Sequence, residues 1–271
     1  MEDLFLFFLF ILGLCVGSFL NVVIQRLPRG SSIIKKRSHC FSCKKNLKWY
    51  DMVPLLSFVF LKGKCRFCHS PISWQYPTVE LITGILFVAT ILFLPEKSIM
   101  YHVVSIKYAI PIVYFLFIVS SFIAIFFIDL KHGIIPDKIV YPAVIISLLY
   151  IILNTYYPLR SEASLILPYF LSAVGAFLFF LLIFLATRGR GMGFGDVKLS
   201  FLMGLVLGFP AIVIALYSAF LTGAIASIIL VVLGKKKIPG GTIPFGPFLV
   251  IGTFIALFFG RYIQEIIRPF F

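Results

Sequence analysis

The chain has 271 residues, of which 61% are hydrophobic and only 13% are charged. A soluble domain carries about 25% charged residues, so this composition excludes a single soluble core and predicts membrane-spanning helices. Lys and Arg number 24 against 10 Asp and Glu, an excess that in a soluble protein would suggest nucleic acid. Here the basic residues lie in loops between apolar runs, so we predict contact with membrane lipid and no nucleic-acid partner.

Apolar runs along the chain predict eight membrane-spanning helices, because a helix crosses the bilayer core in about 20 apolar residues. The run over 199–234 is too long for one helix, and Gly208-Phe209-Pro210 divides it, since Gly and Pro together favour a turn. The run after Glu80 is short. The predicted fold class is therefore an all-α integral membrane protein with about eight transmembrane helices. Its predicted spans cover residues 4–24, 81–94, 108–128, 139–159, 163–187, both parts of 199–234, and 244–260.

The distribution of basic residues predicts the orientation of these helices. If the N-terminus lies outside, most of the 24 Lys and Arg residues fall in loops on the inner side, as the positive-inside rule requires. A seven-helix alternative, with 199–234 as one helix, would place Lys235 to Lys237 outside and weaken this bias. The predicted domains are a first transmembrane helix over 1–25, an inner loop domain over 26–77 and a seven-helix transmembrane domain over 78–271.

Four of the five cysteines lie in the inner loop domain, which is too small for a stable core without a further constraint. They form two Cys-x2-Cys pairs whose spacing is typical of a structural zinc site with four thiolate ligands: Cys40, Cys43, Cys65 and Cys68. The alternatives are two disulfides or four free thiols, and the reducing inner side disfavours disulfides. His39 and His69 flank the pairs, and we expect them to be surface neighbours rather than ligands.

Four of the ten acidic residues lie near or within the membrane, where an ionisable group is costly and therefore a functional candidate: Glu80, Asp129, Asp137 and Asp196. Asp129 ends the third predicted span and Asp196 opens the sixth, so the topology places both at the inner face. Two adjacent carboxylates cannot both ionise. The ionised one can take a proton from water while the neutral one donates to a scissile carbonyl, which is aspartyl protease chemistry.

Simpler structural roles remain open for these acids. Asp196 could cap a helix N-terminus, and Asp129 could pair with Lys131 or His132. Asp137 follows a proline and precedes a span, which favours a helix N-cap.

The glycines before Asp196 also allow two interpretations. Gly191, Gly193 and Gly195 either leave the backbone open to an extended substrate or simply form a turn. Glu80 precedes the second predicted span, where interaction with the helix dipole is the simplest account.

Several motifs together resemble the type IV prepilin peptidases. Gly193-Phe194-Gly195-Asp196 is similar to the GxGD motif of membrane aspartyl proteases, and its surroundings over 191–199 are close to the form seen in prepilin peptidases. Asp129 followed by Pro136-Asp137 is similar to that family's first aspartate motif. The resemblance extends in order along nearly the whole chain, through residues 17–28, the paired cysteines, 76–81 and 243–247.

The resemblance implies an eight-helix bundle in the bacterial inner membrane, with Asp129 and Asp196 as the catalytic pair at the cytoplasmic side. Gly193, Gly195, Asp137 and Lys198 then become supporting residues. It implies cleavage of a basic leader peptide after a glycine in prepilins or pseudopilins. It also implies N-methylation of the new N-terminal residue from S-adenosylmethionine, an activity associated with the cysteine-containing loop.

The expected cofactors are structural zinc and S-adenosylmethionine. The donor site cannot be located from sequence, and Glu80 is a weak candidate for it. A basic leader should be repelled by the basic inner loop, so we expect local acids such as Asp51 or Glu80 to offset the repulsion. Alternatively, the apolar N-terminal helix of the substrate supplies most of the binding by lying against the bundle.

Three other functions are compatible with part of the sequence. A presenilin-type or signal peptide peptidase-type protease shares GxGD but has a different first motif and lacks the cysteine loop. A transporter would usually show repeats and broken helices at the bilayer midplane, whereas these acids lie at the inner face. A zinc-containing scaffold without chemistry leaves the placement of Asp129 and Asp196 unexplained.

Overall fold

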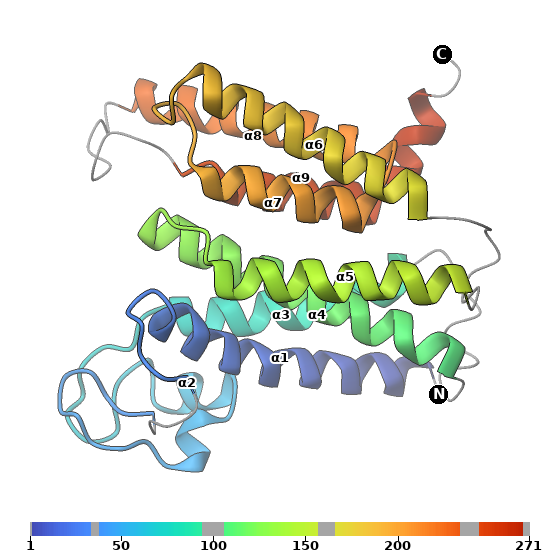
Figure 1. Ribbon diagram of the computed structural model, residues 1–271. Helices are drawn as coiled ribbons and strands as arrows, with labels where there is room; N and C mark the ends of the chain where they lie inside the picture. Colours follow the sequence, from blue (N-terminus) through green and yellow to red (C-terminus); the bar gives the residue numbers. More distant parts are fainter. Residues whose placement is uncertain (1, 34–37, 94–105, 157–165, 234–243, 268–271) are drawn as a thin grey trace. The chain divides into compact units, whose positions relative to one another are not determined.

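The computed structural model describes residues 2–33, 38–93, 106–156, 166–233 and 244–267 (Figure 1). Within these ranges the regular structure is helical, with only two isolated β-bridges, which confirms the predicted fold class. The chain divides into two compact units, Met1–Leu92 and Phe93–Phe271. Basic residues from the orientation argument that fall outside the described residues are Lys35, Lys36, Arg37, Lys97, Arg160, Lys235, Lys236, Lys237 and Arg268.

Unit 1 consists of two long helices joined by the cysteine-containing loop. Its helical segments are α1 (Glu2–Arg26), the 3-10 helix η1 (Trp49–Met52), α2 (Leu56–Phe60) and α3 (Gln75–Phe93). Helices α1 and α3 approach closely through small residues, as is common between membrane helices. A Cβ atom at Gly13 would lie 2.7 Å from the Cα of Gly84, and one at Gly17 would lie 2.7 Å from the Cα of Glu80. The contact therefore depends on glycine in α1.

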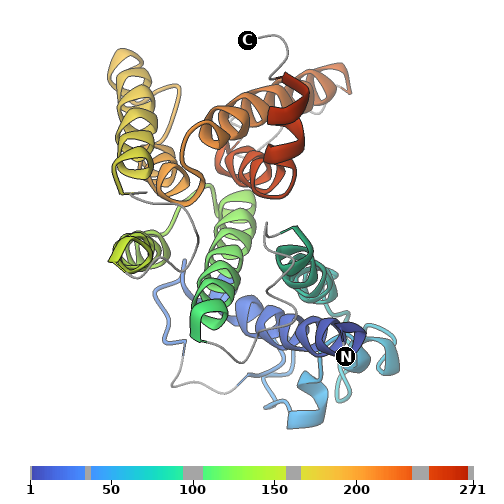
Figure 2. The ribbon, with the colours of Figure 1, turned by 90° about the vertical axis from the view of Figure 1, so that its right-hand side faces the viewer.

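Unit 2 is a bundle of six helices: α4 (Ile106–His132), α5 (Asp137–Tyr156), α6 (Ile166–Ala186), α7 (Phe194–Leu207), α8 (Ala211–Val232) and α9 (Gly246–Ile267). Figures 1 and 2 both show α6 beside α7 and α8 beside α9. Helix α7 also packs against α5 and α9, and most of its residues are buried. It therefore forms the centre of the unit.

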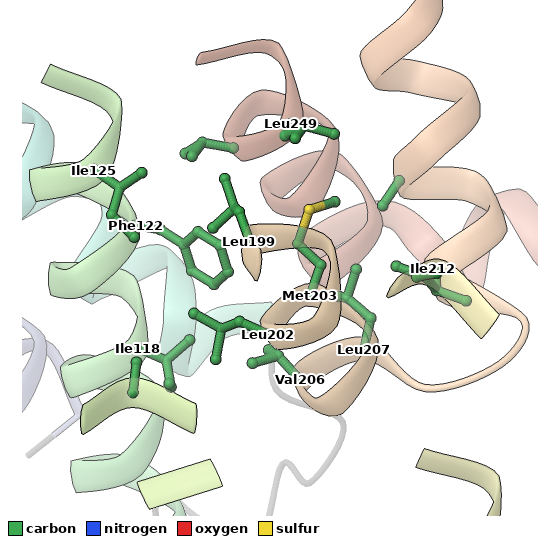
Figure 3. Close-up of a cluster of buried hydrophobic side chains, with 14 of the residues drawn as sticks. Ile118, Phe122, Ile125, Leu199, Leu202, Met203, Val206, Leu207, Ile212 and Leu249 are labelled. Atoms are coloured by element: carbon green, nitrogen blue, oxygen red, sulfur yellow. The ribbon is translucent and has the colours of Figure 1, made fainter. Parts of the chain in front are cut away.

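The hydrophobic core of unit 2 forms around α7 (Figure 3). Phe122 of α4 is 1% exposed and points toward Leu199 and Leu202 of α7, both completely buried. Close helix packing also needs small residues, since a Cβ atom at Gly204 of α7 would overlap the backbone of Ala173 in α6. Tight apolar packing thus fixes where α7 begins, and with it the position of Asp196.

Among the described residues there is a helix for every predicted span, and seven of these helices are long and apolar enough to cross a membrane. The exception is α7, whose 14 residues rise only about 21 Å. The second predicted span was expected to be the short one, and this was wrong. The corresponding helix, α3, begins at Gln75, five residues before Glu80, and is long enough to cross a membrane. The predicted break is confirmed, since α7 ends at Leu207 and α8 begins at Ala211.

We predict that Gly204→Ala destabilises the protein, because the added methyl group would collide with the α6 backbone. Overpacking of this kind costs about 1–3 kcal/mol. Gly175→Ala is the matched control, since a Cβ atom there meets nothing within 4 Å. Thermal unfolding in detergent should show a lower midpoint for Gly204→Ala only; equal midpoints would contradict the close packing of α6 and α7.

Candidate functional site

Asp129 lies near the end of α4 and is 4% exposed. Its carboxylate accepts the backbone N–H of Gly246, the first residue of α9. A Cβ atom at Gly246 would overlap Oδ2 of Asp129, so only glycine allows α9 to begin this close to the carboxylate. The structure therefore adds Gly246 as a site residue. Residues 243–247 belong to the segments that resemble the family, but the sequence did not predict a role for Gly246.

Asp196 is the third residue of α7 and is 7% exposed. Its Oδ2 accepts the backbone N–H of Gly193, the N-cap residue, at 3.3 Å. The side chain thus contributes to the cap of α7 from inside the helix, while Gly193 occupies the N-cap position itself. Asp196 is also close enough to Asp129 for the charge of one to act on the other. The structure places the two predicted aspartates at the same end of unit 2, within range of each other's charge.

Ile135, in the turn between α4 and α5, closes the site from a third side. A Cβ atom at Gly195 would lie 3.0 Å from the Cβ of Ile135, and one at Gly246 would lie 3.2 Å from its Cδ1. Figure 1 shows this turn and the start of α7 at the same end of unit 2, which we call the aspartate end. Gly195 faces Ile135, and because glycine has no side chain, α7 can pack closely against Ile135 at this position.

This arrangement is suited to acid–base chemistry on a peptide bond. Both carboxylates are buried and lie within range of each other's charge, which is the condition under which a carboxylate pair can share one proton. Backbone N–H groups from Gly246 and Gly193 orient one oxygen of each carboxylate. A pair held in this way can act as general base and general acid on opposite sides of a scissile carbonyl.

Asp137 and Lys198 form an ion pair that joins the starts of α5 and α7. Asp137 is the first residue of α5, and its side chain is 52% exposed. Two of the four predicted supporting residues, Asp137 and Lys198, therefore lie at the aspartate end, at the starts of α5 and α7.

The four cysteines of unit 1 form a second candidate site. All four Sγ atoms lie within 4.8 Å of one another, and those of Cys40 and Cys68 are 3.8 Å apart. A tetrahedral zinc ion with bonds of about 2.3 Å separates its sulfur ligands by about 3.8 Å. The backbone N–H of Cys43 lowers the pKa of the Cys40 thiol to about 6, whereas burial and the neighbouring thiols raise the pKa of Cys43 to about 11, so the clustered thiols titrate together. The donor set fits a closed metal site.

The two Cys-x2-Cys segments fold as equivalent turns. In one, the N–H of Cys40 bonds to the carbonyl of Lys45 at 3.0 Å; in the other, the N–H of Cys65 bonds to the carbonyl of Ser70 at 2.9 Å. An isolated β-bridge closes each turn, His39 with Asn46 and Lys64 with Pro71. His39 and His69 are exposed, as expected for surface neighbours. The repeated turn aims each sulfur pair at one point.

Asp51 and Glu80, the acids expected to offset the basic loop, are both buried and engaged. Asp51 Oδ1 accepts Nε of Arg66 at 2.8 Å, and its side chain is only 2% exposed. Glu80 is 6% exposed, and its carboxylate accepts the N–H of Leu55 at 2.9 Å. Glu80 therefore attaches the loop to α3. Because α3 begins earlier than predicted, Glu80 lies within the helix and not at its positive end.

Two family descriptions match the chain. Bacterial Peptidase A24 N-terminal domain matches residues 11–94, and the Type IV leader peptidase family matches residues 115–228. The first range contains the four cysteines and Glu80, and the second contains both site aspartates. No solved structure matches the chain.

Curated relatives named prepilin leader peptidase/N-methyltransferase are similar over most of the chain. The Myxococcus xanthus protein is 35% identical over 231 residues, which is 84% of this chain but 63% of that protein. The Bacillus subtilis protein is 32% identical over 262 residues, 93% of each chain. The Aeromonas salmonicida protein is 32% identical over 283 residues, 93% of this chain and 89% of that protein.

We predict that Gly246→Ala disrupts the aspartate pair, because its Cβ atom would overlap Oδ2 of Asp129. A misplacement of about 1 Å at a reacting group costs about 100-fold in rate, so peptide-bond cleavage should fall by about that factor. The control is Gly260→Ala on the same helix, where the nearest atom to the Cβ would be 3.9 Å away. Equal cleavage rates for both variants would rule out the close approach of α9.

We predict one zinc ion per chain, measured by inductively coupled plasma mass spectrometry of the purified protein. Cys65→Ser should lose most of this zinc, because it leaves three thiolates and opens the tetrahedron. Cys15→Ser should keep it, since Cys15 is an exposed cysteine of α1 outside the cluster. If Cys65→Ser retains as much zinc as Cys15→Ser, the four cysteines do not form the metal site.

Proposed function

Because the chain belongs to the type IV leader peptidase family, we propose that it cleaves the leader peptide of prepilins or pseudopilins and then methylates the new N-terminus. Seven apolar helices and this family membership make it a multi-pass inner-membrane protein. The observation that carries the peptidase proposal is the meeting of Asp129 and Asp196 as buried carboxylates at one end of unit 2.

In the proposed reaction, Asp129 and Asp196 hold one proton between them. The ionised carboxylate takes a proton from a water molecule, whose oxygen then forms a bond to the scissile carbonyl carbon. The neutral carboxyl group donates its proton to the carbonyl oxygen. As the C–N bond breaks, the carboxyl group that took the water proton gives it to the leaving nitrogen, and the other carboxylate takes a hydroxyl proton from the tetrahedral intermediate. Gly246 and Gly193 keep both carboxylates in place by backbone hydrogen bonds.

The positive-inside bias supports an orientation with the aspartate end and the cysteine loop on the cytoplasmic side. We propose that the cleavage site follows a glycine and a basic leader. Asp51 is paired with Arg66 and Glu80 with the N–H of Leu55, so neither is placed to attract that leader. The apolar N-terminal helix of the substrate then supplies most of the binding by packing against the membrane helices.

We propose that the loop over 26–77 carries the methyl-transfer activity and that its cysteines bind structural zinc. S-adenosylmethionine would supply the methyl group to the new terminal amine. Glu80 is the candidate residue for a role in methyl transfer. Its carboxylate accepts the N–H of Leu55, a contact that links the loop to α3. The residues of the chain would then hold the loop in place in two ways. The cysteines would bind the metal within the loop, and Glu80 joins the loop to α3.

We predict that Asp129→Asn and Asp196→Asn each abolish leader removal, because an amide can neither take nor give the required proton. Purified full-length protein is incubated with a prepilin, with and without S-adenosylmethionine, and the products are weighed by mass spectrometry. Wild type should remove the leader, and with the donor its product should gain about 14 Da, the mass of one methylene group.

Thermal unfolding must first show that both Asn variants are folded. If the folded variants still cleave like wild type, Asp129 and Asp196 are not the catalytic pair. If wild type cleaves without the mass gain, the methyltransferase part of the proposal is wrong while the peptidase part stands.

A further inference from the structure

The Lys198 end of its ion pair with Asp137 is more enclosed than in a surface salt bridge, although the Asp137 side chain is 52% exposed. The Lys198 side chain is only 17% exposed, and its Nζ donates to Oδ1 of Asp137. The same ammonium lies 5.7 Å from the ring centroid of Tyr141 and 5.6 Å from that of Phe194. Aromatic faces attract a cation at this range. The two rings and the carboxylate therefore restrict the lysine to one position.

This enclosure connects the segments that carry the aspartates. Asp137 and Tyr141 lie one turn apart at the start of α5, whereas Phe194 and Lys198 lie one turn apart at the start of α7. Asp196 is between them on α7. The Lys198 contacts therefore join the first turn of α5 directly to the turn of α7 that carries Asp196.

A second contact holds the same turn of α7 on the other side of Asp196. Gly195 lies against Ile135, whose side chain also contacts the position of Gly246. Since Ile135 belongs to the turn that follows Asp129 along the chain, the first turn of α7 is fixed before and after Asp196 by the α4–α5 segment.

Replacing Asp137 leaves the enclosed Lys198 charge without its carboxylate partner and poorly solvated, so the lysine side chain moves to reach water. At an exposed site such a loss has little effect. Here the side chain that moves belongs to the helical turn of Asp196, and a movement of that turn changes the distance between the carboxylates directly.

We propose that Asp137 and Lys198 are positioning residues, which hold Asp196 at the distance from Asp129 that proton sharing and cleavage require. This inference rests on the proposed peptidase function. Neither residue contacts the reacting atoms. Their loss lowers the rate of the chemical step and leaves substrate binding nearly unchanged.

The test measures kcat and KM for leader removal by full-length protein in detergent. Asp137→Asn and Lys198→Met should each lower kcat at least about tenfold, with KM within about twofold of wild type. Lys198→Arg, which keeps the charge, should retain more activity than Lys198→Met. The charge exchange Asp137→Lys with Lys198→Asp should recover part of the kcat that the single variants lose.

Lys138→Met is the matched control, because it removes one exposed positive charge next to Asp137 without touching the pair. Its kcat should stay within about twofold of wild type. Thermal unfolding of every variant separates loss of rate from loss of fold. If Lys198→Met proves unstable, the kcat of Asp137→Asn relative to that of Lys138→Met still tests the positioning role.

Three results would overturn the inference. A raised KM with unchanged kcat in Asp137→Asn would mean that the half-exposed carboxylate binds a cationic group of the substrate directly. Unchanged kinetics in both single variants would mean that the pair is only a surface contact. A folded charge-exchange variant without any recovery would exclude an electrostatic attachment.

Wild type and Asp196→Asn are assayed in parallel to separate this inference from the proposed function. If wild type cleaves, Asp196→Asn does not, and Asp137→Asn matches wild type, the positioning role alone fails. If wild type fails to cleave or Asp196→Asn cleaves normally, the peptidase proposal fails and the positioning role fails with it.

Discussion

The hydrogen bond from the first N–H of α9 to the Asp129 carboxylate is the contact on which the aspartate end depends. It brings the backbone of Gly246 so close to Asp129 that no side chain fits between them. The start of α9 is therefore fixed to the end of α4, and α8 follows because it packs along α9. An N-terminal helix N–H group is unsatisfied within its own helix, so the same contact orders the helices and satisfies this buried donor.

The rest of the site is held by similarly short connections between neighbouring elements. Asp196 is oriented by its own helix cap, and Ile135 fills the space beside Gly195. Apolar packing around α7 places this turn at the end of the bundle. Polar groups that would be costly in an apolar bundle are thus satisfied by backbone donors, which keeps the carboxylates in defined positions and close to each other.

The sequence was informative where function or fold depends on local spacing. The Cys-x2-Cys pairs predicted the cysteine cluster, and Gly208 with Pro210 predicted the break after α7. The contact of Gly246 with Asp129 could not be predicted, because it joins segments more than a hundred residues apart and depends on how α4 and α9 pack. Burial of Glu80 was missed because polar residues before it concealed the true start of α3.

The shortness of α7 has a consequence for how the protein responds to its bilayer. A helix in contact with lipid must match the hydrocarbon thickness, and it tilts when the membrane becomes thinner or thicker. Helix α7 is largely buried by its neighbours, so hydrophobic mismatch acts on those neighbours and not on α7 itself. The helix that carries Asp196 is therefore shielded from direct contact with lipid, whereas α4, which carries Asp129, is long enough to cross the membrane and feels changes in acyl-chain length itself.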